Sequence, residues 1–301
     1  MKRFFILATA AIVALASCAK TEVVYNDAPK EIAFKALNGA MTKADALGDK
    51  GYTDMGVYAF DEEGEPYFSQ VKFAPATAGA DWTATPQAQY WPLSGSLNFV
   101  YYAPWFAVNA TASTLTAQLT TATDFMYGTE VVNASKQNTA IGAPLRHALA
   151  KINVSVTSDL EGLVINSLTL TSAYTNAELT VNYSTTDNDQ TSNDERLSFD
   201  FNGATVTNIT FANVAGTTEA NVKYSDACYV MPHEQTSLVL NYTLPGADAA
   251  LEYEHELEDN WYDGHQYTYD FLIGANEIKF TPSETTWATG ADEDITVDPN
   301  M

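Results

Sequence analysis

The sequence is poor in cysteine, in basic residues and in long apolar segments. Its 301 residues contain two cysteines, and 14 Lys and Arg stand against 38 Asp and Glu, which gives a net charge of −24. Two cysteines are too few for a disulfide framework, and so acidic a chain repels nucleic acid and anionic lipid surfaces. No segment reaches the ~20 apolar residues of a membrane-spanning helix. We therefore expect no nucleic-acid partner and no later membrane span.

The motifs of common catalytic sites are also missing. The sequence has no glycine-rich phosphate loop, no G-x-S-x-G, no C-x-x-C and no H-E-x-x-H, the spacings that position nucleophiles, phosphates or zinc. His147 has no acidic or thiol neighbour in the sequence, so we interpret it as a packing or hydrogen-bonding residue. Cys228 lies in the apolar run "ACYVMP", which favours a buried small hydrophobe. The sequence predicts no enzyme and no cofactor.

Two acidic stretches are candidate metal sites. Glu252, Glu254 and Glu256 alternate along one face of an expected strand. The segment 186–195 offers the oxygen ligands that calcium prefers, but it lacks the glycine turn of an EF-hand loop. Its acidic residues are Asp187, Asp189, Asp194 and Glu195. A solvated strand surface and a hydrated loop are the simpler interpretations, so we predict that neither stretch binds a metal.

Short segments that alternate apolar and polar residues dominate the chain after residue 50. Gly, Pro, Asn and Asp clusters separate them, and no helical period extends over ten residues. This pattern predicts an all-β protein with stacked antiparallel sheets, and the length suits two domains. The polar segment 133–144 is the expected boundary, which gives domains 44–143 and 144–301. The expected strands are 55–60, 67–75, 96–104, 151–156, 162–171, 178–183, 196–201, 208–213, 237–244, 251–257 and 267–273.

Residues 1–17 have the pattern of an export signal. Two basic residues follow Met1, and the predominantly apolar run 4–16 comes next. This run is too short to span a bilayer and typical of a signal peptide. The sequence Leu-Ala-Ser before Cys18 resembles the lipobox of bacterial lipoproteins, which implies cleavage before Cys18 and a lipid on its thiol. The alternative is an ordinary secretory signal followed by a chance cysteine.

The segment "EIAFKALNGAMTKAD", residues 31–45, alternates and then ends in a small-residue stretch. Ile32, Phe34 and Ala36 are expected to face the protein core, while Glu31, Ala33 and Lys35 face outward. Lys43 follows the small residues, with Ala44 after it, in a stretch that a protease can enter. The segment is either the first strand of the mature protein or a piece that is removed.

Several local patterns in a fixed order resemble one family. They are the lipobox at Cys18, "IAFKALNGAMTKA" at 32–44, "FVYYAPW" at 99–105, "DFMYG" at 124–128, "LRHALAKINVSV" at 145–156 and "WYDGHQYTYDFLIGANEIKF" at 261–280. Together they resemble the fimbrillin family of Bacteroidetes, the Mfa-like and FimA-like pilins, from about residue 15 onward. The resemblance implies two transthyretin-like antiparallel β-sandwich domains in tandem.

The resemblance also implies a function. In such pilins a lipid on the cysteine, here Cys18, holds the precursor at the outer membrane. A trypsin-like surface protease then cuts, here between Lys43 and Ala44, and so removes a propeptide, 18–43, with its first strand. The subunits polymerise with other fimbrial subunits by strand exchange into a type V pilus, which supports adhesion. The alternative is that Lys43 is a surface lysine in a linker.

The expected donor strand is the tail, residues 281–301. Its large apolar residues are Trp287, Ile295 and Val297, and the last two alternate with polar residues. The alternative is that the tail forms a final strand of its own domain. Its low apolar content would suit a minor or tip subunit.

Two other classes of function stay open. One is a lipid-anchored surface protein that keeps residues 19–43 and binds a partner such as a glycan. Its aromatic platform would consist of Tyr90, Trp91, Trp105 and Trp261, although core packing is the simpler use of these side chains. The other is a surface enzyme with paired carboxylates, but no spacing singles out a pair.

Overall fold

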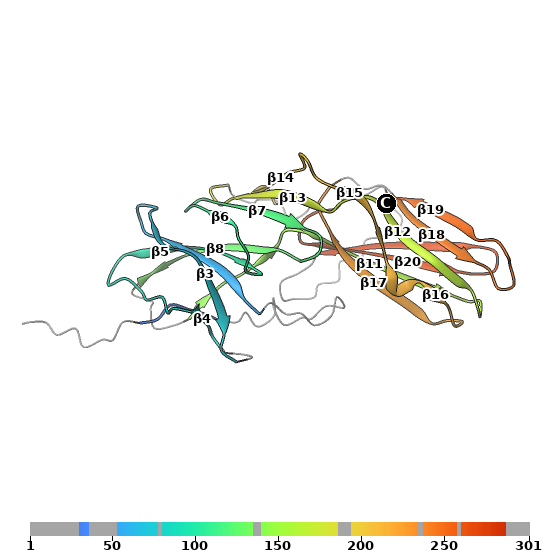
Figure 1. The fold of residues 1–301 in the computed structure, drawn as a ribbon, viewed down its shortest axis with the longest axis horizontal. Helices are drawn as coiled ribbons and strands as arrows, with labels where there is room; N and C mark the ends of the chain where they lie inside the picture. The colour runs from blue at the N-terminus through green and yellow to red at the C-terminus, as the bar shows by residue number, and fades with distance from the viewer. Residues whose placement is uncertain are drawn as a thin grey trace, which may run out of the picture.

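The computed structural model describes residues 30–35, 53–77, 80–134, 140–185, 194–233, 237–257 and 260–286. These residues form an all-β protein, as predicted, and they include the short 3-10 helix η2, Ala212–Val214. The molecule is elongated, with the N-terminal strands at one end and the C-terminal strands at the other (Figure 1).

Ten strands precede residue 150 and eleven follow among the described residues. The first set is β1 (Ala33–Lys35), β2 (Met55–Phe60), β3 (Pro66–Pro75), β4 (Trp82–Thr85), β5 (Ser96–Ala103), β6 (Asn109–Ala110), β7 (Thr114–Thr120), β8 (Met126–Asn133), β9 (Ile141–Gly142) and β10 (Arg146–His147). The second set is β11 (Ala150–Ser158), β12 (Val164–Tyr174), β13 (Asn176–Asn182), β14 (Leu197–Asp200), β15 (Val206–Thr210), β16 (Gly216–Thr217), β17 (Lys223–Val230), β18 (Ser237–Thr243), β19 (Leu251–Glu256), β20 (His265–Ile273) and β21 (Ile278–Thr286).

The N-terminal half is built on an eight-stranded sheet with the order β10-β8-β5-β2-β3-β4-β1-β9. Every residue of β2 is buried, because both faces of the sheet are covered there. On one face Val57 and Phe99 join a cluster that we call the first core. On the other face Tyr58 and Val100 join the second core. Strands buried on both faces explain why "MGVYAF" and "SLNFVYYA" are nearly continuous apolar runs.

A four-stranded sheet joins the two halves of the chain. Its order is β14-β13-β7-β6, so strands from before and after residue 143 lie in the same sheet. Strand β13 pairs antiparallel with β7 along its whole length, from Asn176 opposite Thr120 to Asn182 opposite Thr114. This sheet covers the second core. The domain boundary between residues 143 and 144 remains a prediction. The β7–β13 ladder connects the segments on the two sides of that boundary.

The C-terminal half is a sandwich of two further sheets. Their orders are β17-β11-β20-β21 and β15-β12-β18-β19, and the third core between them includes Trp261 and Phe271. Strand β11 pairs antiparallel with β17 and parallel with β20. The indole N–H of Trp261 donates to the Tyr269 hydroxyl at 3.0 Å, which satisfies the one polar atom of this buried ring.

The expected tail begins inside a strand. Strand β21 pairs with β20 from Ile278 opposite Ile273 to Thr286 opposite His265. The backbone N–H of Gly274 donates to the Glu277 carbonyl at 2.9 Å and forms the turn that returns β21 to the sheet. Residues 281–286 are therefore part of the C-terminal sandwich, and residues 287–301 lie outside the described residues.

Candidate functional site

Strand β1 occupies an interior position of the eight-stranded sheet. It pairs antiparallel with β4, where Phe34 lies opposite Trp82, and parallel with β9, where Phe34 lies opposite Ile141. Just before β1, the Ile32 N–H donates to the Gln89 carbonyl at 2.8 Å, and the Trp91 N–H donates to the Lys30 carbonyl at 3.0 Å. The segment 30–35 thus fills a slot between three separate pieces of backbone.

The side chains of this segment alternate as the sequence predicted. Ile32 and Phe34 are buried in the first core, with Phe34 only 1% exposed, while Glu31 and Lys35 are exposed. The Phe34 ring meets Phe73 and Phe99 edge to face, with centroid distances of 5.1 and 5.5 Å, a favourable geometry for aromatic pairs. Burying Ile32 and Phe34 is worth roughly 1.5–3 kcal/mol each. The segment 30–35 therefore completes the first core of the N-terminal half through the side chains of Ile32 and Phe34.

We call the position of residues 30–35 the β1 groove. Without these residues, β4 and β9 would present unpaired backbone groups, and the rings around Phe34 would border an open apolar slot. An unpaired strand edge beside an apolar surface is a template for another strand. Ala36 lies outside the described residues, as do Cys18, Lys43 and Ala44.

The four residues of the suggested aromatic platform do not come together. Trp91 is buried in the first core and Trp261 in the third. Tyr90 and Trp105 are 46% and 42% exposed. Two of the four rings thus serve core packing, because an indole is large enough to fill a sandwich interior. Trp105 stays at the surface.

The acidic candidates have separate structural roles. Glu252, Glu254 and Glu256 are exposed on the outer face of β19. Asp194 is instead 4% exposed, so it is no part of a hydrated loop. Its carboxylate accepts hydrogen bonds from Tyr127 at 2.7 Å and from the Arg196 guanidinium. Within the part of the chain that the structure describes, no group of three or more His, Cys, Asp or Glu is arranged for a metal. Asp187 and Asp189 lie outside that part.

Asp194 links the two halves of the molecule, since Tyr127 belongs to β8. Burial tends to raise the pKa of Asp194, but the hydrogen bonds from Arg196 and Tyr127 outweigh burial and leave that pKa below its ordinary value. Its backbone N–H donates to the Asp263 carboxylate at 2.7 Å. Burial raises the pKa of Asp263 to about 7. The carboxylate of Asp194 is thus occupied by structural partners.

His147 has an acidic neighbour that the sequence does not show. Its Nδ1 lies 2.8 Å from an oxygen of Asp124, and both side chains are buried. The two residues are 23 positions apart and meet because β10 pairs with β8, next to the turn that carries Asp124. Cys228 is partly buried on β17, and burial raises the pKa of its thiol. A protonated thiol fits the predicted apolar role.

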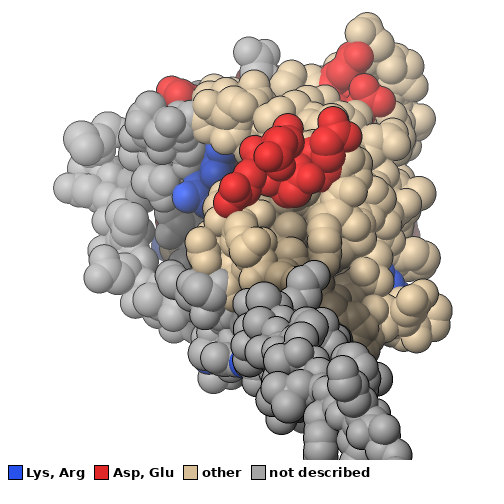
Figure 2. All heavy atoms as spheres, turned by 90° about the vertical axis from the view of Figure 1, so that its left-hand side faces the viewer, with Lys and Arg blue, Asp and Glu red and all other residues tan. Residues whose placement is uncertain are grey.

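Acidic side chains gather at one end of the molecule. This end lies at the left of Figure 1, and Figure 2 shows an acidic patch on it. The turn between β2 and β3 lies at this end and exposes Glu62, Glu63 and Glu65. The Asp61 carboxylate fixes the turn by accepting the N–H groups of Glu63 at 3.1 Å and Glu65 at 2.8 Å. Such a face repels nucleic-acid phosphates. In the part of the chain that the structure describes, none of the helical segments has the length and apolar character of a membrane span.

Comparison with known families matches residues 35–287 to a family model described as fimbrillin-like. No curated protein matches the sequence.

Several solved structures have a similar fold. One is a proposed cell adhesion protein from Bacteroides uniformis, with a TM-score of 0.60 and 16% identity, covering 87% of this chain and 99% of that chain. Another is a proposed cell adhesion protein from Bacteroides ovatus, with a TM-score of 0.56 and 13% identity, covering 88% and 100%. A third is a fimbrial protein from Bacteroides vulgatus, with a TM-score of 0.53 and 16% identity, covering 86% and 100%.

The packing around Phe34 leads to a stability prediction for the chain that retains residues 30–35. We expect Phe34→Ala to lower the free energy of unfolding by about 3–5 kcal/mol, because the lost ring leaves a cavity among other aromatic rings. Lys35→Ala, at the exposed neighbouring position, should change it by less than about 0.5 kcal/mol. Urea denaturation measures both. Equal effects of the two substitutions would show that Phe34 does not fill the first core.

Proposed function

Because the chain belongs to the fimbrillin-like family, we propose that it is a structural subunit of a fimbrium at the cell surface. The proposal has four steps: export as a lipoprotein with a lipid on Cys18 in the outer membrane, cleavage after Lys43 by a trypsin-like protease, release of residues 18–43, and polymerisation with other fimbrial subunits by strand exchange. The polymer supports adhesion.

The observation that carries the proposal is the way residues 30–35 are held. They fill an interior position of a sheet, yet β1 pairs through only two residues with β4 and two with β9. Lys43 lies in the sequence between this segment and β2. While the chain is intact, the covalent link keeps the local concentration of the segment high. A cut after Lys43 turns its rebinding into a bimolecular event, which favours departure.

When β1 leaves, a replacement for it in the β1 groove has to meet two requirements. The replacement must supply backbone hydrogen bonds to β4 and to the Gln89 and Trp91 backbone. It must also supply two apolar side chains at alternate positions, in place of Ile32 and Phe34. A strand from another subunit meets both requirements, and its main chain gives affinity while its side chains give register.

The proposed donor is the tail, now restricted to residues 287–301 because β21 continues to Thr286. Ile295 and Val297 have the same spacing of two residues as Ile32 and Phe34. Fifteen extended residues span roughly 50 Å, enough to reach beyond the subunit's own sandwich. Trp287 supplies a third large apolar group near the start of the tail.

The first test addresses cleavage. We expect Lys43→Ala to leave a full-length precursor with a lipid-blocked Cys18 and no polymer. The wild-type surface form should begin at Ala44. Amino-terminal sequencing and detergent-resistant ladders on immunoblots provide the measurements. Lys50→Ala is the matched control, because it removes the next basic residue and should leave processing intact. Ladders from the Lys43→Ala protein would contradict cleavage as the trigger, and a wild-type surface form that keeps residues 19–43 would favour an anchored binding protein instead.

The second test addresses the donor. Val297→Asp would place an unpaired charge in an apolar slot, which costs several kcal/mol, so the variant should fold normally but fail as a donor. Thr296→Asp adds the same charge on the opposite face of the strand and should still polymerise. Deletion after Thr286 should behave like Val297→Asp. In mixtures, both defective variants should accept a wild-type tail. Polymers formed by the deletion variant alone would place the donor elsewhere in the chain.

A further inference from the structure

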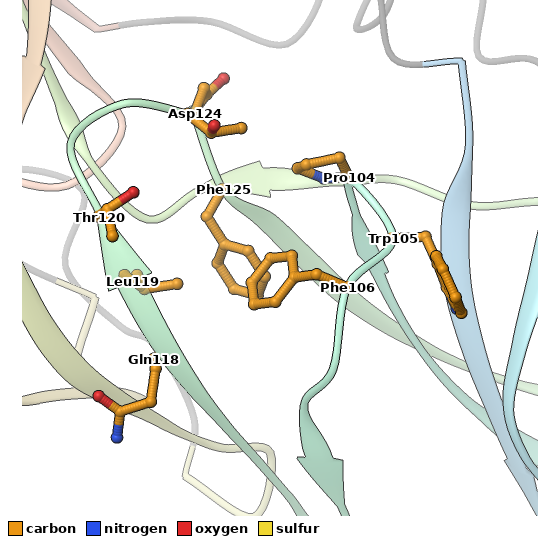
Figure 3. A pocket seen from close by; sticks show the side chains of 9 residues that line it. Pro104, Trp105, Phe106, Gln118, Leu119, Thr120, Asp124 and Phe125 are labelled. Atoms are coloured by element: carbon orange, nitrogen blue, oxygen red, sulfur yellow. The ribbon is translucent and has the colours of Figure 1, made fainter.

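The open cleft of the N-terminal half gives a partner little to hold. It has a volume of about 280 Å³ and lies between the loop after β5 and the end of β7. Figure 3 shows the rings of Phe106 and Phe125 packed on each other, whereas the side chains of Trp105 and Gln118 point away from them. The Gln118 amide already donates to the Glu178 carboxylate at 2.5 Å. The β1 groove is the place with better-defined requirements for a partner.

The second apolar position of the β1 groove has the shape of an aromatic ring. Three rings surround Phe34 there, and their planes are steeply inclined to its own, at 61° to 89°. The centroids of Phe73, Phe99 and Tyr101 lie 5.1, 5.5 and 6.0 Å from that of Phe34. A smaller side chain at this position would leave a cavity among the rings, and cavities in a close-packed core are destabilising. An aromatic side chain therefore fits this position best.

The end of the β1 groove where segment 30–35 begins is acidic. Glu31 forms a β-bridge with Tyr90, and the Tyr90 carbonyl accepts a hydrogen bond from the Tyr67 hydroxyl at 2.9 Å. Tyr67 follows the β2–β3 turn with its three exposed glutamates, and Figure 2 shows the acidic patch on this end. A donor that takes over the backbone pairs of β1 runs antiparallel to β4 and parallel to β9. Its first residues therefore pass the acidic end, where further negative charge is disfavoured.

The present occupant suits both features of the groove, and the tail of this chain suits neither. Residues 30–35 read "KEIAFK", with two lysines and one glutamate, a net charge of +1, and phenylalanine at the second apolar position. When Ile295 is aligned with Ile32, residues 293–298 read "EDITVD". This sequence has three acidic residues and no basic one, a net charge of −3, and valine at the second apolar position. The tail thus has the right spacing for the groove but the wrong size and charge.

We propose that the β1 groove accepts a donor strand from a different fimbrial subunit more tightly than the tail of a second copy of this chain. The preferred donor has an aliphatic residue, an aromatic residue two positions later, and no net negative charge over the six residues that fill the groove. Specificity of this kind combines a fitted pocket with repulsion of the wrong partner. The inference rests on the proposed strand exchange and adds the class of partner to it. The tail of this chain then serves the groove of another subunit.

The test measures which strands enter the groove of the full-length chain. The recognition sequence of a site-specific protease replaces residues 38–43, and the chain is cut there. Fluorescent peptides then compete with the released segment, and fluorescence anisotropy gives their affinities. One peptide has the tail sequence 287–301. The others carry Val297→Phe, the pair Glu293→Lys and Asp298→Lys, or all three substitutions.

Each kind of substitution should strengthen binding separately. We expect Val297→Phe and the lysine pair each to raise the affinity by about tenfold, and the three substitutions together by roughly a hundredfold, because they act on different parts of the groove. Salt distinguishes the two contributions. In about 1 M sodium chloride, where the screening length is ~3 Å, the gain from the lysine pair should largely vanish and the gain from Val297→Phe should persist.

Two matched variants of the chain test the acidic end. Neutralising the three exposed glutamates of the β2–β3 turn should raise the affinity for the unmodified tail peptide, because it removes like charge beside the groove. Neutralising three exposed glutamates of β19 removes the same charge from the C-terminal half and should leave that affinity nearly unchanged. The substitutions are Glu62→Gln, Glu63→Gln and Glu65→Gln in the turn, and Glu252→Gln, Glu254→Gln and Glu256→Gln on β19.

The outcomes separate this inference from strand exchange itself. A tail peptide that binds as tightly as the peptide with all three substitutions overturns the inference and leaves strand exchange standing. If none of the peptides binds, and a peptide with the chain's own residues 28–37 does not bind either, strand exchange fails and the inference fails with it.

Discussion

Phe34 reaches the first core from a strand of three residues, and its ring packs edge to face against Phe73 and Phe99. The first core, which fills one face of the eight-stranded sheet, is arranged around that contact. Strands β4 and β9 are neighbours of β1 and pair with it, not with each other. If the ring leaves, the core loses contacts on several strands at once, and two strand edges lose their partner. The segment 30–35 therefore closes the sheet between β4 and β9, and in our proposal its departure opens the place for another strand.

The connection between the N-terminal and C-terminal halves is extensive, whereas β1 is held by a few backbone pairs. Strands β7 and β13 form a long antiparallel ladder across the expected domain boundary. Asp194 adds a second link by accepting hydrogen bonds from Tyr127 of β8 and from Arg196. Separating the halves would break the ladder and expose the second core. The molecule thus combines an end that is closed by a few residues with a middle in which the sheets interlock, a combination that suits a subunit that exchanges one strand and keeps the rest of its fold.

Local patterns in the sequence predicted most of the long strands. They did not predict strands with a weak pattern, very short strands, or contacts that depend on the pairing of distant strands. The runs "MGVYAF" and "KINVSV" were recognised because they are buried on both faces, as β2 and β11. Strand β7 was missed although Leu115, Ala117 and Leu119 alternate inward, because threonines and a glutamine dilute the pattern. The contact of His147 with Asp124 depends on the pairing of β10 with β8, which no local pattern encodes. The inward alternation of Ile32 and Phe34 was visible in the sequence. Their neighbours β4 and β9 were not, because β4 has only four residues and β9 two.

The proposed strand exchange requires a strand of a neighbouring subunit to take the place of residues 30–35 in the polymer. A cryo-electron microscopy structure of fimbriae sheared from cells that express this chain tests the claim directly. Strand exchange predicts that the slot between β4 and β9 contains a strand of the adjacent subunit. Two apolar side chains of that strand should lie at the positions of Ile32 and Phe34, and residues 30–35 of the same chain should have no density. A polymer in which Phe34 still packs against Phe73 and Phe99 of its own subunit would contradict it.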